Sequence, residues 1–376
     1  MTESIDRMIA ELAAHADRYE RAARSQEAAF LGRSGPPPLL LHGGLTDAQQ
    51  AYGAYDYKEI HFDPDKMLAN ELRSALAAMN GGRQAAPSVR ANMGCGIVPA
   101  LMGITPLLFK DKMPWVKQRL PKEALREMRP SDLRILPEFR QALDHMVYMA
   151  KALRGSGVRV YPVDIQGALD TAHIALGDDI FYQMYDDPEF VHHLLSLSCA
   201  AAEMAFAECL KVMPGSGEFV PHYNALAMPR GLGGIKLSED TSTLLNAGQI
   251  EEFVVPYMNR LLSFAGGGYV HYCGANPHLY RAVMNQPLAH AINFGNPEKH
   301  DMPAVLRDCA ERGKLYYGSL PRAADTALID HFSALLCAAQ RNDRNHLLLQ
   351  MSCESHELDQ VRSAWDQACE AIEVNP

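Results

Sequence analysis

Short β-type runs alternate with helical stretches along most of this chain, and this alternation limits its fold more than any other feature. Eight such runs follow one another, at 87–94, 158–167, 217–224, 233–240, 269–274, 290–296, 314–319 and 346–353. Parallel strands need long crossover connections, usually helices, and the crossovers are right-handed. The pattern therefore predicts an α/β protein, a (β/α)8 barrel of the TIM type. An open doubly wound sheet is the alternative, and the link at 225–232 is too short for a full helix.

The segment before the first run has a different pattern. Residues 1–30 are Ala-rich and charged with the spacing of an amphipathic helix, 34–44 is a proline-rich break without a helix, and 63–80 is a second helix with Pro64 in its first turn. We therefore expect an N-terminal helical extension over residues 1–60 and a barrel domain over residues 61–376.

Charge and cysteine content exclude several classes of protein. The chain carries 35 basic and 45 acidic residues, a net charge of −10, without a long basic run, which argues against nucleic-acid binding. No apolar run approaches the roughly 20 residues that span a bilayer, and the N-terminus lacks the apolar core of a signal peptide. The eight cysteines show no compact disulfide spacing. We expect a cytoplasmic protein with reduced thiols, some of which could hold a metal.

Polar side chains gather where the predicted strands end, which in a barrel is the edge that carries the active site. Asp240 and Glu239 close the fourth run and are candidate catalytic groups, although a helix cap or a solvated loop carboxylate is an equal alternative for Asp240. Further strand ends supply candidate substrate contacts, namely Asn92, Asp164, Gln166, His222, Asn224, Asn293 and Tyr317.

A His-x-Cys pair ends the fifth run. Side chains two apart on a strand share a face, so His271 and Cys273 point the same way. Zinc accepts imidazole and thiolate ligands, and a catalytic site takes three protein ligands. Cys353 ends the eighth run in the equivalent place, and we expect it to be the third ligand. The alternative is a buried thiol beside a hydrogen-bonded histidine.

From about residue 60 onward the sequence resembles the uroporphyrinogen decarboxylase superfamily. The likeness is strongest in VDIQGALDTAHIALGDDIFYQMYDDPEFVHHLL and in GGGYVHYCGANPHLY. The second stretch resembles the zinc-containing branch, whose members move a methyl group between a corrinoid protein and a thiol or folate. The resemblance implies a zinc site at His271, Cys273 and Cys353, a methyl-corrinoid (methylcobalamin) as donor or acceptor on a partner protein, and a small-molecule substrate. It also allows a homodimer.

Two other functions remain open at this point. A decarboxylase-like lyase would act on a carboxylated tetrapyrrole, but the arginine-bearing N-terminal signature of that enzyme is absent, and Asn92 stands where an aspartate is expected. Arg90 and Arg230 are few for a ligand with many carboxylates. A non-catalytic barrel that binds a corrinoid or a partner is the third possibility.

Overall fold

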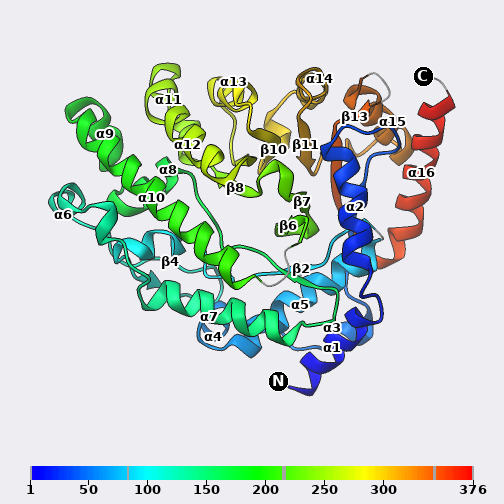
Figure 1. Cartoon of the computed structure of the whole chain (residues 1–376). Helices are drawn as coiled ribbons and strands as arrows, with labels where there is room; N and C mark the ends of the chain where they lie inside the picture. The colour runs from blue at the N-terminus through cyan, green and yellow to red at the C-terminus, as the bar shows by residue number, and fades with distance from the viewer. Residues whose placement is uncertain (1, 83, 214–216, 342–343, 375–376) are drawn as a thin grey trace.

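One parallel sheet organises the molecule (Figure 1). The computed structural model describes residues 2–82, 84–213, 217–341 and 344–374. Six strands pair in parallel in the order β1-β14-β11-β10-β9-β8. Their bounds are β1 (Leu39–Gly43), β8 (Ile235–Ser238), β9 (Gly268–Tyr272), β10 (Ala289–Phe294), β11 (Leu315–Gly318) and β14 (Leu347–Cys353).

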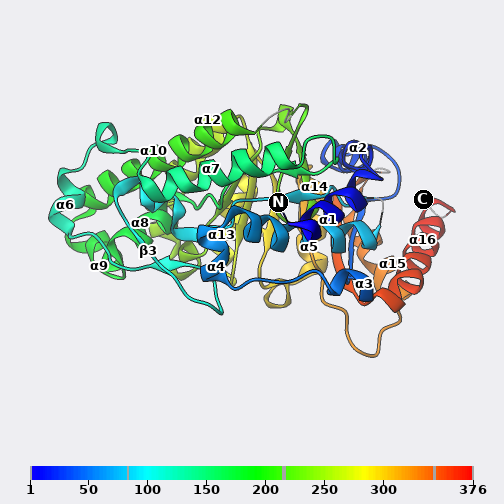
Figure 2. The same cartoon turned by 90° about the horizontal axis from the view of Figure 1, so that it is seen from below.

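Helices surround this sheet and connect its strands (Figures 1 and 2). They are α1 (Glu3–Ala13), α2 (Arg18–Phe30), α3 (Asp47–Gln50), α4 (Tyr57–Phe62), α5 (Pro64–Gly81), α6 (Lys122–Glu127), α7 (Pro137–Ala152), α8 (Ala168–Leu176), α9 (Asp179–Asp186), α10 (Pro188–Val212), α11 (Ala247–Phe253), α12 (Val255–Ala265), α13 (Pro277–Asn285), α14 (Met302–Arg312), α15 (Leu328–Ala339) and α16 (Leu358–Val374). Sequence signals set their ends: Asp63 caps α5 ahead of Pro64, and Gly266 ends α12 in the left-handed conformation.

The predicted α/β class is confirmed, but closure of an eight-stranded barrel is not detected. β2 (Ser88–Val89) pairs in parallel with β5 (Arg159–Val160), and a single bridge between Gln166 and Ser238 links the segment after β5 to β8. Within the described residues, no strand pairing joins β1 to β2. The short strands β3 (Pro106–Leu107), β4 (Trp115–Val116), β12 (Gln340–Arg341) and β13 (Arg344–Asn345) form separate antiparallel pairs.

The third predicted strand, 217–224, is the clearest correction. It contains β6 (Phe219–Pro221), which turns back through a short 3-10 segment and pairs antiparallel with β7 (Ala227–Pro229). Leu226 and Met228 then pack with alternate residues of the sheet, including Tyr269 and Tyr317, and with Ala29 of α2. The hairpin and α2 therefore cover the inner face of the sheet, and the run at 217–224 does not supply the third parallel barrel strand that we expected.

A second difference lies in the proline-rich segment. It contains no helix, as expected, but its LLLHG run forms β1 and pairs along its whole length with β14. The three prolines come before the strand, so the hydrogen bonds of β1 are intact. An edge strand of the main sheet thus comes from the first 60 residues.

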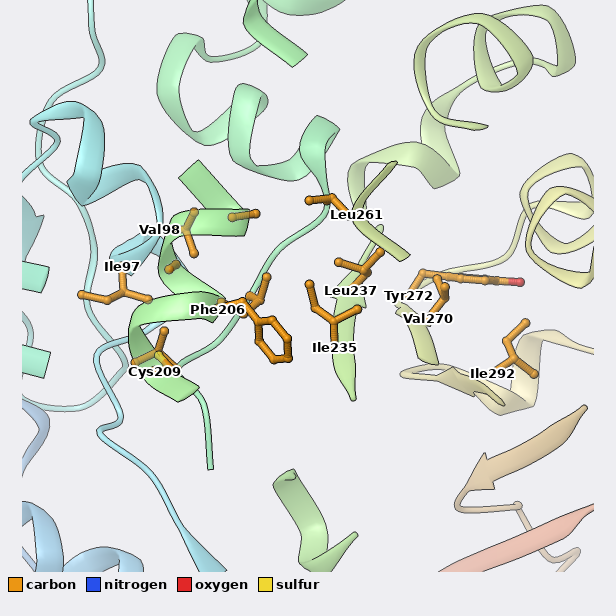
Figure 3. Close-up of a cluster of buried hydrophobic side chains, with 14 of the residues drawn as sticks. Ile97, Val98, Phe206, Cys209, Ile235, Leu237, Leu261, Val270, Tyr272 and Ile292 are labelled. Atoms are coloured by element: carbon orange, nitrogen blue, oxygen red, sulfur yellow. The ribbon is translucent and has the colours of Figure 1, made fainter. Parts of the chain in front are cut away.

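The outer face of the sheet carries the main hydrophobic core (Figure 3). In this view Ile235 and Leu237 of β8 and Val270 of β9 face helix side chains that include Phe206 of α10. Burial of each such side chain stabilises the fold by about 1.5–3 kcal/mol. Among the described helices, α10 alone is long and apolar enough to cross a membrane, but 61% of its most apolar window is buried within the protein. Its apolar side chains pack in this core.

Candidate metal centre

Three potential metal ligands meet at the carboxyl edge of β8 and β9. Ser238 pairs with His271 in register, so the two residues after β8 and the end of β9 lie side by side. The ligand atoms of Asp240, His271 and Cys273 all lie within 4.8 Å of one another. His271 Nε2 is 3.6 Å from Cys273 Sγ and 3.9 Å from Asp240 Oδ1. The backbone N–H of Cys273 donates to Asp240 Oδ1 at 2.6 Å, which fixes the carboxylate beside the thiol.

These distances suit a zinc ion. With Zn–N near 2.0 Å and Zn–S near 2.3 Å, a tetrahedral ion separates an imidazole nitrogen from a thiolate sulfur by about 3.5 Å. The structure has 3.6 Å between these two atoms. The nitrogen–oxygen distance of 3.9 Å exceeds the about 3.4 Å expected for a tetrahedral site, a difference that a small side-chain movement removes. Imidazole, thiolate and carboxylate are all zinc ligands, so the residues fit the ion.

The protonation of the cluster depends on burial. Burial lowers the pKa of His271, as does the charge of Lys236, so its imidazole is neutral and able to bind a metal. Burial raises the pKa of the Cys273 thiol to about 11, and the Asp240 carboxylate adds to this effect. Without a cation the thiol therefore keeps its proton at neutral pH, and metal binding must release it.

The loop that carries Asp240 is held from two sides. Asp170 of α8 accepts hydrogen bonds from the backbone N–H groups of Asp240 at 2.8 Å and Thr241 at 2.7 Å. Asn276, which caps α13, donates to the carbonyl oxygens of Thr243 at 3.0 Å and Leu245 at 2.8 Å. The loop that carries the Asp240 carboxylate is thus hydrogen-bonded to α8 and to the residue that caps α13. These contacts hold the cluster in place before any ligand binds.

Glu239 lies under this loop, outside the cluster. It is 1% exposed and accepts a hydrogen bond from Ser242 Oγ at 2.8 Å. Burial raises its pKa well above the ordinary value, and the nearby Asp170 carboxyl adds to this. A Cβ at residue 167 would lie 2.1 Å from Glu239 Oε1, so the Glu239 side chain fits there because residue 167 is a glycine. A catalytic role for Glu239 stays a prediction.

A cavity of about 380 Å³ adjoins the cluster on the inner side of the sheet. Asp164, His222, Asn224, Asn293 and Tyr317 line it together with His271. Their role as substrate contacts stays a prediction. Two predicted contacts lie elsewhere. Asn92 donates to Glu71 at 3.4 Å, and Gln166 is buried at the bridge to Ser238.

The cavity also contains charged groups that the sequence analysis did not assign to the site. Lys236 Nζ donates to Asp164 at 2.6 Å, and Arg90 Nη1 lies 3.7 Å from the other oxygen of that carboxylate. Burial would raise the pKa of Asp164, but Lys236 and Arg90 outweigh it and lower that pKa to about 2. The Arg90 guanidinium lies over the rings of Tyr161 and Tyr223. A sequence signal for Lys236 exists: it is the charged residue between the apolar Ile235 and Leu237 of a predicted strand.

Cys353 is not brought to the cluster. It ends β14 beside Gly43 of β1, and β11 and β10 separate β14 from β9. Its side chain is partly buried against the main core. Burial raises the pKa of the Cys353 thiol, and the nearby charges that add to or oppose this are Glu357, Arg362 and Glu354. Strand ends at one edge of a sheet lie far apart when other strands intervene, so Cys353 cannot reach His271 and Cys273. Among the described residues, Asp240 is the third potential ligand beside them.

Comparisons with known proteins bear on the fold of this chain. No protein-family model matches the chain, and no curated protein sequence matches it significantly. A solved structure of a methyltransferase from Methanosarcina mazei aligns with a TM-score of 0.62 over 92% of this chain and 98% of its own length, at 12% sequence identity. At this identity the likeness concerns the fold alone: this chain shares the fold of that structure.

Proposed function

We propose that this protein is a zinc-dependent methyltransferase that moves a methyl group between a methyl-corrinoid and a thiol or tetrahydrofolate. The observation that carries the proposal is the cluster of Asp240, His271 and Cys273 beside a cavity, in a methyltransferase-like fold. The corrinoid, on a partner protein, and the choice of acceptor come from the resemblance described above. A cytoplasmic location and a homodimer belong to the same proposal.

In this proposal Asp240, His271 and Cys273 would hold the ion. A bound Zn²⁺ supplies Lewis acidity, which lowers the pKa of a substrate thiol so that it is a nucleophile at neutral pH. The cavity residues bind and orient the rest of the molecule. His222 Nε2 and Arg90 Nε are buried without a hydrogen-bond partner among the described residues, and both residues line the cavity. Tyr161 and Tyr269 supply aromatic walls to the cavity.

The cavity gives no support to a decarboxylase of carboxylated tetrapyrroles. Arg90 and Lys236 are the basic side chains among its described lining residues, and Asp164 neutralises one of the two charges. A ligand with many carboxylates needs several converging cations. The volume of about 380 Å³ lies near the lower end of small-molecule sites.

Metal content tests the proposal directly. We expect about one zinc per chain in the purified protein, lost in Cys273→Ala and Asp240→Ala. Cys353→Ala is the discriminating control: it retains zinc if Asp240 is the third ligand and loses it if Cys353 is. Cys337→Ala, at an exposed thiol on α15, controls for the loss of any cysteine.

Activity is measured by the loss of the methyl–cobalt absorbance of free methylcobalamin with candidate thiols or tetrahydrofolate. We expect turnover by the wild type and none by Cys273→Ala. A well-folded wild-type protein that binds no zinc at micromolar concentration would overturn the proposal.

A further inference from the structure

His271 has a second hydrogen-bonding partner on the side away from the cluster. Asn293 of β10 is its register partner on the neighbouring parallel strand, so the two side chains project from the same face of the sheet. His271 Nδ1 lies 2.5 Å from Asn293 Oδ1, and Asn293 Nδ2 donates to the backbone carbonyl oxygen of Tyr317 at 2.5 Å. A chain of hydrogen bonds therefore crosses three adjacent strands and ends at the cluster.

The carbonyl at the far end of this chain sets the direction of every hydrogen bond in it. A backbone carbonyl can only accept, so the amide group of Asn293 must turn its NH₂ toward Tyr317 and its oxygen toward His271. The amide oxygen in turn can only accept, so His271 must carry its proton on Nδ1. The lone pair of the neutral imidazole is then on Nε2, the atom 3.6 Å from Cys273 Sγ.

The sheet leaves room for this amide. Gly318 of β11 follows Tyr317, and a Cβ at that position would lie 2.8 Å from Asn293 Nδ2. The φ of Gly318 is +153°, at the edge of the range that side chains disfavour. Asn293 therefore fits between β9 and β11 because residue 318 has no side chain.

We propose that Asn293 is a positioning residue that fixes the tautomer and orientation of His271, so that Nε2 is presented to the metal. This inference rests on the metal site of the proposed function. It gives Asn293 a role that differs from the substrate contact expected from the sequence. Histidine ligands of metals commonly donate their second ring N–H to an acceptor, and loss of that acceptor typically costs 10–100-fold in metal affinity.

The tautomer can be read in the metal-free protein, independently of any metal. The ring ¹⁵N chemical shifts of ¹⁵N-histidine-labelled protein distinguish Nδ1–H from Nε2–H, and a His271→Gln variant assigns the signal among the 15 histidines. We expect His271 to be the Nδ1–H tautomer in the wild type and a mixture in Asn293→Leu. An Nε2–H tautomer in the wild type overturns the inference, whether or not the protein binds zinc.

Metal affinity gives the second readout, with Co²⁺ as a spectroscopic probe and Zn²⁺ in competition. We expect Asn293→Leu to bind 10–100-fold more weakly than the wild type. Asn293→Asp keeps an acceptor for the Nδ1–H and should recover part of the loss. Gln350→Leu removes an amide from the same cavity without a contact to His271 and should bind like the wild type.

The outcomes separate the two proposals. Wild-type affinity in Asn293→Leu overturns the role of Asn293 but leaves the metal site standing. A wild type that binds neither metal overturns the proposed function, and the NMR measurement then still decides the tautomer. If Asn293→Leu fails to fold, the wild-type tautomer and the Asn293→Asp affinity decide the question.

Discussion

Gly295 leaves space for the sulfur of Cys273. A Cβ at residue 295 would lie 2.4 Å from Cys273 Sγ, although the backbone there is not in the left-handed region. We expect Gly295→Ala to displace the thiol and to weaken zinc binding on the order of 10–100-fold, with the free energy of unfolding changed by less than about 1 kcal/mol. Equilibrium dialysis measures the affinity. Gly231→Ala, where a Cβ has nothing within 4 Å, is the control. Wild-type affinity in Gly295→Ala would contradict this expectation.

Asp164 predicts a pH dependence of stability. Burial opposes its ionisation, but Lys236 and Arg90 lower its pKa from 3.8 to about 2. A carboxyl whose pKa is lower in the folded state stabilises the protein above its unfolded pKa. That contribution, about 2 kcal/mol, is lost as the pH falls from about 4 to about 2.

The Asp164→Asn variant tests this. Urea unfolding should show it less stable than the wild type by about 2 kcal/mol or more at pH 7, with the difference shrinking below about pH 4. Exposed Asp330→Asn on α15 serves as the control. A difference that is the same at pH 7 and pH 3 would show that Asp164 does not act through its charge.

The site could be predicted from the sequence only as far as strand ends define it. His271 and Cys273 are two apart on one strand, and Asp240 follows the strand paired with theirs, so local pattern and chain order suffice to bring them together. Cys353 satisfies the same rule but ends a strand separated from β9 by two others, and a sequence does not give that distance. The partnership of Asn293 with His271 depends on the register between β9 and β10, which a one-residue slip would abolish.

At the scale of elements, the hairpin of β6 and β7 shows why the pairing expected for one predicted strand was wrong. The run at 217–224 has the apolar composition of a strand, which it is, but its partner was not predictable from composition. A parallel crossover needs a dozen or more residues, so the short link at 225–232 was the signal for an antiparallel return. β1 was missed because prolines precede it, and because its partner β14 lies about 300 residues away in the chain.

Gln26 of α2 ties that hairpin to the N-terminal segment. The side chain is fully buried, donates to the carbonyl oxygens of Gln84 and Ala225, and accepts from the N–H of Ala227. In Gln26→Leu these backbone groups lose a partner, and we expect a loss of about 2–4 kcal/mol in the free energy of unfolding. Denaturant unfolding measures it, with exposed Gln367→Leu as the control. A loss below about 1 kcal/mol would show that the hairpin is held by its apolar contacts alone.

At the scale of the whole molecule, the alternation of strands and helices gives the α/β class, since it needs only local patterns. Closure of the sheet into a barrel does not follow from the alternation, because closure requires that the two edge strands pair with each other. The inner face is occupied by Leu226 and Met228 of the hairpin and Ala29 of α2, and the six-stranded sheet ends at β1. The candidate metal cluster, at the ends of β8 and β9, and the strand from the N-terminal segment thus lie toward opposite edges of one sheet.

That arrangement makes the boundary near residue 60 testable. Removal of residues 1–60 takes away β1, leaving the edge of β14 unpaired, and it takes away α2 from the inner face. Ile5, Met8 and Leu12 of α1 also belong to the main core. We expect a chain of residues 61–376 to aggregate or to lose cooperative unfolding, because an unpaired, apolar strand edge invites association. Size-exclusion chromatography and thermal unfolding, beside the full chain, measure both effects. A soluble fragment that unfolds cooperatively near the midpoint of the full chain would instead establish residues 61–376 as a domain that folds independently.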